Sequence, residues 1–400
     1  MIIGIDISSI PYGTGVSNYT RELVKNLVKI DKTNTYKLFF SSLRQPLPPE
    51  IKKLKKHSNV KIFHFRLPIT LLEILFNKLH ILPVESFIGK CDVFHTSDWT
   101  QPPARQAKLI TTIHDLTPFI YPQWLDQKII STHTQKMKLA TKHCSHFICV
   151  SKNTQKDLLK LFPKINSNTT SVIYEAVAKK YSKFYQLKQK CRGDPCGRPQ
   201  IQINQIKKKY GLDDFILAQG TREPRKNLSR LIKAFTNFKL LHPTSNLQLA
   251  IAGKYGWGND ICHPAASASG WKRSRGICQQ SSIKILGYIP EKDMVPLHAA
   301  AIALIYPSLY EGFGLPILKA MSIGTPVITS NTSSMPEVAG NATILINPKS
   351  TQSIKNAIQK IAISPKLHQS LIKKGLIQAS KFSWTKTAHQ TLQIYKKMLL

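Results

Sequence analysis

Residues 215–235 read FILAQGTREPRKNLSRLIKAF, which is the pattern of a buried strand, a polar turn and an amphipathic helix. The apolar run ends at Gly220, and apolar residues then return at helical spacing, at positions 228, 231, 232 and 235. A strand that leads directly into a helix is the repeating unit of parallel α/β sheets. The stretch therefore predicts an α/β fold.

The same unit recurs along the chain, where short β-branched or aromatic runs alternate with helical patterns. In the first half we expect strands over residues 2–6, 37–41, 60–65, 92–96, 109–115, 146–151 and 171–175. In the second half we expect them over residues 215–220, 247–253, 283–288, 303–308, 326–331 and 342–347. Two Rossmann-like domains with parallel sheets are therefore predicted, facing each other across an interdomain cleft at the carboxyl ends of their strands.

Irregular sequence separates the two halves. Residues 191–199, CRGDPCGRP, consist largely of turn formers and show neither a helical nor a strand period. We therefore expect an N-terminal domain over residues 1–178 and a linker with an insertion over residues 179–210. A C-terminal domain follows over residues 211–383, with a second insertion at about 260–280.

The composition is that of a globular protein. Hydrophobic residues make up 42% of the 400 positions and charged residues 20%, which excludes a mainly disordered chain. No apolar run approaches the ~18–20 residues of a membrane span, and the N-terminus does not resemble a secretory signal, so we expect a cytoplasmic protein. Seven cysteines indicate free thiols, and the spacing of Cys191, Cys196, Cys262 and Cys278 fits no usual zinc site.

The charge is strongly positive, with 57 Lys and Arg against 21 Asp and Glu and a formal net charge of +36. Such a field attracts nucleic acid, anionic lipid or phosphorylated ligands, although a general spread of lysines over the surface would give the same total. No zinc-finger or RNP-like signature accompanies the charge, so nucleic acid is not an expected partner.

Arg225 and Lys226 are the first candidate site residues, because they lie between the carboxyl end of a predicted strand and the start of a helix. Arg can hold phosphate oxygens in a fork, and Lys supplies a compact charge, so the pair suits a diphosphate. The alternative is a solvated basic turn.

Residues 306–321, YPSLYEGFGLPILKAM, form the second candidate element, which again follows a predicted strand. Gly312 and Gly314 allow a ligand to approach the backbone, and the N–H groups of the following helix start form an anion site. Glu311 would accept hydrogen bonds from the hydroxyls of a sugar, although it could instead be a capping carboxylate near the helix start.

Two weaker elements lie in the first half. The loop Gly13-Thr14-Gly15-Val16 follows the first strand and precedes a helix, but a lone Gly-x-Gly has little specificity. His114 and Asp115 end a buried strand at the edge where α/β proteins bind ligands, although a lone histidine is more often structural.

Taken together, these residues resemble the retaining nucleotide-sugar glycosyltransferases of family 4, which have the GT-B architecture. The similarity covers most of the chain and includes the motifs at residues 4–6 with 13–19, 114–115, 150–154, 223–227, 286–290, 306–321 and 382–384. The Glu-Pro-Arg-Lys-Asn wording at residues 223–227 is most similar to bacterial mannosyltransferases of polysaccharide assembly. The resemblance implies that the first domain holds the acceptor and the second the nucleotide sugar, with a helix over about 384–400 packing back on the first domain.

The resemblance also implies roles for individual residues. Arg225 and Lys226 match the basic pair that binds the donor diphosphate, and Glu311 matches the first acid of the Glu-x7-Glu motif, which contacts the transferred sugar. His114 matches a histidine near that sugar. We expect these four to be catalytic, and the donor to be bound by Gly15, Gly220, Arg225, Lys226, Glu311, Gly312, Phe313, Gly314, Leu315 and Lys319.

Position 319 departs from the family pattern. The second Glu of the motif should stand there, and this chain has Lys319. In the family that acid accepts hydrogen bonds from the ribose hydroxyls, whereas an ammonium group can only donate. An alternative function therefore stays open, namely a degenerate nucleotide-sugar-binding protein with little or no transferase activity.

The implied function is transfer of a hexose, with mannose favoured, from a nucleotide-diphosphate sugar such as GDP-mannose or a UDP-hexose. The expected acceptor is a glycan or lipid-linked molecule in cell-envelope polysaccharide synthesis. Because preorganised cations can stabilise the leaving diphosphate, and no Asp-x-Asp motif occurs in the sequence, neither a metal nor another cofactor is expected.

Residues 52–83 suggest a contact with membranes. Five lysines at positions 52–61 precede Leu71, Ile74 and Leu75, which follow helical spacing. An interfacial helix beside a basic patch would place the protein peripherally at the inner face of an anionic membrane. A buried helix of the first domain is the alternative.

Overall fold

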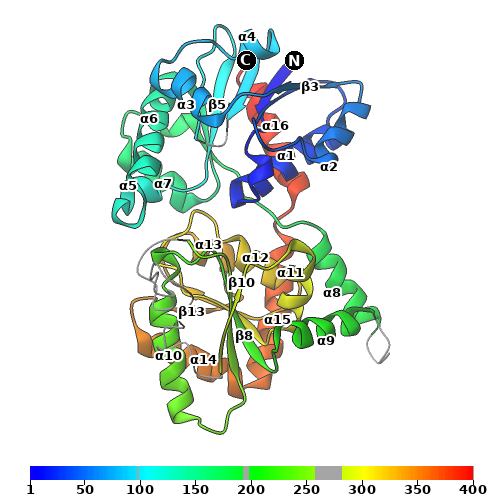
Figure 1. Cartoon of the computed structure of the whole chain (residues 1–400), viewed down its shortest axis with the longest axis vertical. Coiled ribbons are helices and arrows are strands. Elements are labelled where there is room, and N and C mark those ends of the chain that lie inside the picture. Colours follow the sequence, from blue (N-terminus) through cyan, green and yellow to red (C-terminus); the bar gives the residue numbers. More distant parts are fainter. Residues whose placement is uncertain (97–98, 192–197, 257–281, 400) are drawn as a thin grey trace, which may run out of the picture. The chain divides into compact units, whose positions relative to one another are not determined.

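The computed structural model describes residues 1–96, 99–191, 198–256 and 282–399 (Figure 1). The chain divides into two compact units. The first comprises Met1–Ala176 together with Phe382–Leu400, and the second comprises Val177–Lys381. Each unit is built on one parallel sheet between helices, so the predicted pair of Rossmann-like α/β domains is confirmed.

The first sheet has the strand order β3-β2-β1-β4-β5-β6-β7. Its strands are β1 (Ile2–Asp6), β2 (Thr35–Ser41), β3 (Val60–Phe65), β4 (Val93–Thr96), β5 (Lys108–Ile113), β6 (Cys144–Cys149) and β7 (Thr170–Val172). All pair in parallel, in the doubly wound order that brings ligand-binding loops to the carboxyl ends. Each predicted strand of the first half is therefore confirmed to within a few residues.

Helices cover both faces of the first sheet. One face packs on α1 (Gly15–Ile30), α2 (Pro49–Lys52), the short helix η2 (Lys53–Lys56) and α16 (Trp384–Lys397). The other face packs on α3 (Ile69–Glu73), η3 (Ile74–Lys78), α4 (Glu85–Ile88), α6 (Gln127–His143) and α7 (Lys152–Leu161). Shorter helices are η1 (Ile10–Tyr12), α5 (Thr117–Ile120), η4 (Pro122–Trp124) and η5 (Ser167–Thr169).

The C-terminal helix α16 belongs to the first unit, beside α1 (Figure 1). Trp384, Ala388 and Tyr395 lie in the same core cluster as residues of β1 and α1. The hydroxyl of Tyr395 lies 2.6 Å from Nδ1 of His95 on β4, so the last helix also completes a buried polar contact.

The second sheet has the order β10-β9-β8-β11-β12-β13. Its strands are β8 (Phe215–Gln219), β9 (Gln248–Ala252), β10 (Ile283–Gly287), β11 (Ala303–Tyr306), β12 (Val327–Ser330) and β13 (Ile344–Ile346). One face is covered by α10 (Leu228–Leu241), α14 (Thr351–Ile363) and α15 (Pro365–Ser380). The remaining short elements each follow a strand. They are η6 (Pro224–Lys226) after β8, α11 (Glu291–Ala300) after β10, α12 (Leu315–Ser322) after β11 and α13 (Met335–Ala339) after β12.

The described part of residues 179–210 is not the irregular linker that the sequence predicted. This stretch forms α8 (Lys180–Lys190) and α9 (Arg198–Tyr210), and both belong to the second unit. Tyr181 and Phe184 of α8 and Ile203 of α9 are buried against α11. This burial stabilises both helices, because tertiary packing, not helix propensity, supplies most helical stability. The expected insertion at 260–280 lies outside the described residues.

The segment considered for membrane contact is half-buried. Leu72 and Phe76 of α3 and η3 are buried in the core, whereas Leu71 and Ile74 are exposed. None of the helices in the described part of the chain combines the length and apolar character that a membrane crossing requires.

Gly253 allows two strand ends of the second sheet to approach each other. A Cβ at this position would lie 1.7 Å from the backbone oxygen of Gly220, and the φ of Gly253 is +155°. We expect Gly253→Ala to lower the free energy of unfolding by about 2–4 kcal/mol. The backbone must shift to remove the clash with Gly220, and alanine disfavours this φ.

Gly287→Ala is the matched control for this substitution. Gly287 has a φ of +67°, but no heavy atom lies within 4 Å of its added Cβ. Only the left-handed backbone opposes alanine there, at about 1–2 kcal/mol. Urea unfolding of both variants measures the difference, and equal losses would show that the close approach has no energetic role.

Candidate active site

Three of the predicted site residues meet at the carboxyl edge of the second sheet. Arg225 and Lys226 lie in η6, which follows β8, and Glu311 lies in the loop after β11. Because β8 and β11 are neighbouring parallel strands, their carboxyl ends open on the same edge. The backbone also joins the two loops, since the N–H of Leu309 donates to the carbonyl of Arg225 at 2.8 Å.

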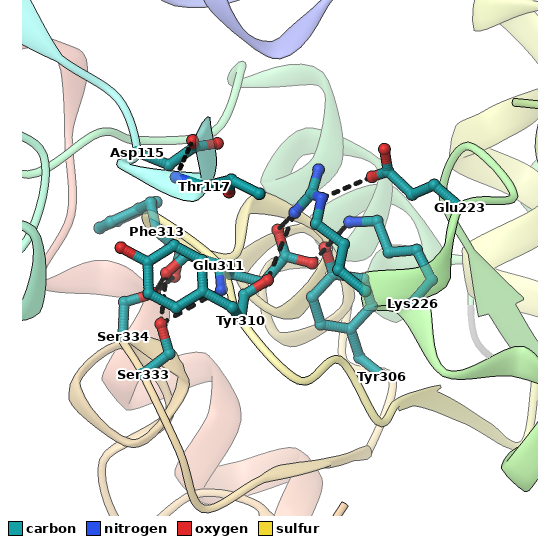
Figure 2. A network of polar contacts seen from close by, with 11 residues as sticks. Asp115, Thr117, Glu223, Lys226, Tyr306, Tyr310, Glu311, Phe313, Ser333 and Ser334 are labelled. Carbon is teal, nitrogen blue, oxygen red and sulfur yellow. Dashed lines mark hydrogen bonds and ion pairs between the residues drawn. The ribbon is translucent and has the colours of Figure 1, made fainter. Parts of the chain in front are cut away.

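Glu311 lies between the two cations. Nζ of Lys226 lies 2.5 Å from Oε1 of Glu311 and also donates to the hydroxyl of Tyr306 at 2.7 Å (Figure 2). The guanidinium of Arg225 binds the other oxygen, Oε2. Lys226 and Glu311 are only 7% and 6% exposed, so these charges are held largely away from water.

A second carboxylate extends the cluster. Oε1 of Glu223 lies 2.5 Å from Nε of Arg225, and Glu223 is 9% exposed (Figure 2). Two cations therefore face two anions in one network. Buried charges are tolerated when they are paired in this way.

The two carboxyl groups have pKa values that shift in opposite directions. Burial by itself would raise the pKa of Glu311, but the charges of Arg225 and Lys226 outweigh it and hold that pKa at about 2. Burial raises the pKa of Glu223 above its ordinary value, and the nearby Glu311 adds to this effect. Burial also lowers the pKa of Lys226, and the negative charge of Glu311 opposes this shift. Glu311 is therefore charged at neutral pH.

Hydroxyl groups from the loop after β12 fix the backbone of Glu311. The hydroxyls of Ser333 and Ser334 both donate to the carbonyl of Glu311, at 2.6 and 2.8 Å. Ser334 also donates to the carbonyl of Phe313 at 2.9 Å, and the N–H of Glu311 donates to Ser333 at 3.1 Å (Figure 2). The position of the carboxylate is thus set by three strand ends, those of β8, β11 and β12.

Four further predicted donor residues follow Glu311 directly in the chain. Gly312, Phe313 and Gly314 are buried and follow it directly, and Gly314 caps α12 with a φ of +107°, a conformation that favours glycine. Leu315 is the first residue of that helix. The helix start therefore lies directly after the charge cluster, where an anion would also be favoured.

Gly220 makes room for the lysine of the cluster. A Cβ there would lie 3.0 Å from Cε of Lys226, and the φ of Gly220 is +142°. Asn227 then ends η6 with a φ of 59°, and its amide donates to the carbonyls of Pro307 and Pro348 at 3.1 and 2.7 Å. These contacts fix the turn that carries the basic pair.

Lys319 lies on α12, one helical turn beyond Leu315. Its Nζ lies 5.7 Å from the ring centroid of Tyr181 on α8, a cation–π contact. The ammonium at the position of the expected second Glu therefore has an aromatic partner in this structure.

Two predicted site residues, His114 and Gly15, lie in the first unit. Nδ1 of His114 lies 3.1 Å from Oε1 of the buried Glu175, and the ring of Tyr19 packs edge-on against the imidazole at 4.7 Å. Nε2 of His114 has no hydrogen-bond partner within the described residues. Gly15 is the first residue of α1, whose start is capped by Thr14 and Ser17 in a capping box.

The sequence analysis did not predict Glu175, Ser333 or Ser334 as parts of these sites. Tyr306 and Glu223 were included only as members of longer motifs, with no role of their own. Each of these residues is at or just beyond the carboxyl end of a strand. That position is the signal that could have found them, because ligands of α/β sheets bind at this edge.

No cluster of metal ligands accompanies the site in the described ranges. Within residues 1–96, 99–191, 198–256 and 282–399, no three His, Cys, Asp or Glu side chains gather in a group that could hold a metal ion.

Two family models match the chain in succession. Residues 13–179 match Glycosyltransferase Family 4, and residues 200–377 match Glycosyl transferases group 1. O-antigen chain mannosyltransferase B of Escherichia coli is 28% identical over 394 residues, which span 96% of this chain and 96% of that relative.

Solved structures share the architecture. Sucrose-phosphate synthase from Thermosynechococcus elongatus matches with a TM-score of 0.70 and 19% identity over 100% of this chain and 99% of the other. Anabaena HepE in complex with UDP-glucose matches with a TM-score of 0.68 and 16% identity over 99% and 100%. These likenesses support the GT-B fold. The chain is therefore a glycosyltransferase, with a Glycosyltransferase Family 4 domain in its first half and a Glycosyl transferases group 1 domain in its second.

Proposed function

We propose that this enzyme transfers a mannosyl group from GDP-mannose to a glycan or lipid-linked acceptor in the assembly of a cell-envelope polysaccharide. The similarity to an O-antigen mannosyltransferase along nearly the whole chain supports the sugar and the acceptor class. The observation that carries the proposal is the buried cluster of Arg225, Lys226 and Glu311 at a strand edge, where a sugar diphosphate would meet both cations and the carboxylate.

In the proposed reaction, the two cations stabilise the charge that develops on the leaving diphosphate. Arg225 and Lys226 are already oriented by Glu311 and Tyr306, so little reorganisation is needed when phosphate oxygens arrive. The diphosphate then shares the two cations with Glu311. Glu311 can then accept hydrogen bonds from hydroxyls of the transferred sugar.

Retention of the anomeric configuration is part of the proposal. The acceptor hydroxyl would attack from the face that the diphosphate leaves, and the departing phosphate would take its proton. His114 and Gly15 are proposed to contact the same donor, as the family resemblance implies. Glu175 holds Nδ1 of His114, so Nε2 is the nitrogen that could reach a sugar hydroxyl. The reaction is proposed to need no metal, and to take place in the cytoplasm, peripherally at an anionic membrane.

A screen of nucleotide sugars tests the proposal. Release of nucleoside diphosphate is measured for GDP-mannose, UDP-glucose and other UDP-hexoses, with and without a mannose-terminated acceptor glycan. We expect acceptor-dependent release from GDP-mannose and an unchanged anomeric configuration by NMR of the product. Preference for another donor would refute the mannosyl assignment, and inversion would refute the mechanism.

A degenerate, binding-only protein is the alternative that Lys319 favours, because its ammonium replaces an acid expected to bind ribose. Saturable binding of a nucleotide sugar without any release of nucleoside diphosphate would support this reading over the enzymatic one.

We expect Lys319→Glu to tighten donor binding by about 0.5–1.5 kcal/mol, the net value of one regained hydrogen bond. The cation–π contact with Tyr181 is lost, but the diphosphate and sugar contacts are unchanged. Titration calorimetry with the donor measures the change. Lys374→Glu, which makes the same change in charge at an exposed position of α15, is the control. Weaker binding by Lys319→Glu alone would identify Lys319 as a phosphate ligand.

A further inference from the structure

A pocket lined by basic side chains opens in the first unit, at the carboxyl ends of β2 and β3. Its volume is about 400 Å³, within the range of pockets that hold small ligands. The basic residues that line it are Arg44, Lys52, Lys55, His64 and Arg66. The other lining residues are uncharged, namely Ser42, Leu43, Gln45, Pro46 and Leu47.

These basic groups converge from separate elements. Lys52 and Lys55 come from α2 and η2, which Ile51 and Leu54 anchor in the core. The loop after β2 is held by Ser42, whose N–H donates to the carbonyl of Phe65 and whose hydroxyl accepts from the N–H of Gln45, at 3.2 and 2.9 Å. The fold thus fixes the backbone positions from which these basic side chains reach the pocket.

No carboxylate balances the pocket. In the described part of the chain, none of its five basic residues forms an ion pair with an acid. Glu50 lies on the same helix as Lys52, but it forms its ion pair with Arg21, with 3.3 Å between Oε1 of Glu50 and Nε of Arg21. Like charges gathered in one pocket repel each other, and an anion that enters would relieve this repulsion.

The chemistry of the lining favours phosphate. Two guanidinium groups offer forks of N–H donors, and two ammonium groups add compact charge. A phosphate or diphosphate group presents several acceptor oxygens and more than one negative charge in a small volume. The basic pair of the candidate active site lies in the other unit, so this pocket is a second place for such a group.

We propose that this pocket binds a phosphate or diphosphate group that is not part of the sugar donor. Two sources share this chemistry, a soluble molecule carrying the group and the headgroup of an anionic phospholipid. The proposal does not depend on which sugar the enzyme transfers.

Two double variants test the proposal. Arg44→Gln/Arg66→Gln removes two charges from the pocket. Arg105→Gln/Lys108→Gln removes two charges from exposed positions at the amino-terminal end of β5, the opposite edge of the same sheet. Inorganic pyrophosphate is titrated calorimetrically into each variant and into the unmodified enzyme. All three proteins keep the same candidate active site, so any pyrophosphate bound there is common to them and does not affect the comparison.

We expect pyrophosphate to bind the pocket variant at least about tenfold more weakly than the control variant, since two charge-assisted contacts are lost. In a second arm, vesicles of phosphatidylcholine with and without phosphatidic acid are sedimented with each protein. If the pocket variant, but not the control variant, also loses binding to the vesicles with phosphatidic acid, the ligand is a lipid headgroup. If it loses pyrophosphate binding but sediments with these vesicles as the control does, the ligand is a soluble molecule.

Equal losses in both double variants would overturn the proposal, because net charge alone would then explain the binding. Unchanged binding in both arms would overturn it as well. Failure of the proposed glycosyl transfer would be seen separately, as absence of nucleotide release from every sugar donor.

Discussion

Replacing Lys226 with methionine should lower the rate of sugar transfer by about 10²–10³-fold, the range seen when one preorganised electrostatic contact is removed from an active site. Lys226 is buried and donates to both Glu311 and Tyr306, so its ammonium has a fixed position before the donor binds. Methionine keeps much of the length and the apolar stem but removes the charge that would stabilise the leaving diphosphate.

Steady-state kinetics with the preferred donor measure the effect, and circular dichroism reports whether the variant is folded. Lys233→Met is the matched control, because Lys233 is exposed on the neighbouring helix α10. We expect the control to keep the activity of the unmodified enzyme. Near-normal turnover by a folded Lys226→Met enzyme would contradict the assignment of this lysine to the donor diphosphate.

Glu311→Gln should lower both stability and activity. The carboxylate pairs with Arg225 and Lys226 in a buried site, and the neutral amide leaves those two cations with Glu223 as their remaining charge partner in the cluster. The pKa of Glu311 is held at about 2, against an ordinary value of 4.5. That difference corresponds to about 3 kcal/mol of stability at neutral pH.

The pH dependence gives the sign of this contribution. Because the pKa of Glu311 is lower in the folded than in the unfolded state, its contribution is complete above about pH 4.5 and is lost as the pH falls toward 2. Unfolding by urea at a series of pH values should therefore show a shallower acid-side decline for Glu311→Gln than for the unmodified enzyme.

Glu291→Gln is the control for this measurement, because Glu291 pairs with Lys180 at the surface of the same unit. We expect its pH profile to follow that of the unmodified enzyme. Identical acid-side profiles for all three proteins would show that Glu311 is not held ionised by its neighbours. Full transfer activity of Glu311→Gln would remove this residue from the catalytic group.

The strands of both sheets could be predicted because each is a short apolar run closed by a turn-forming residue. The pair of Arg225 and Lys226 could be predicted for the same reason, since it follows such a run directly. The contact of this pair with Glu311 could not be derived from spacing, because 85 positions separate Lys226 from Glu311 and only the pairing of β8 with β11 joins them.

Features that depend on contacts between distant residues could not be predicted from the sequence. Ser333 and Ser334 carry no motif of their own, and they become part of the site because β12 ends beside β11. Helices α8 and α9 were not predicted because their sequences are rich in Lys and Gln and flank the turn formers at residues 191–199. Packing against α11 stabilises them in the fold.

The return of α16 to the first unit has a consequence for biosynthesis. Every segment of the second unit lies in one continuous stretch, Val177–Lys381, whereas the first unit draws its final helix from residues beyond it. On a ribosome, the core around β1 and α1 must wait for Trp384 and Tyr395, which are synthesised only after the whole second unit. The unit that is synthesised first is thus completed after the second, and its apolar face stays uncovered by α16 while the second unit is being made.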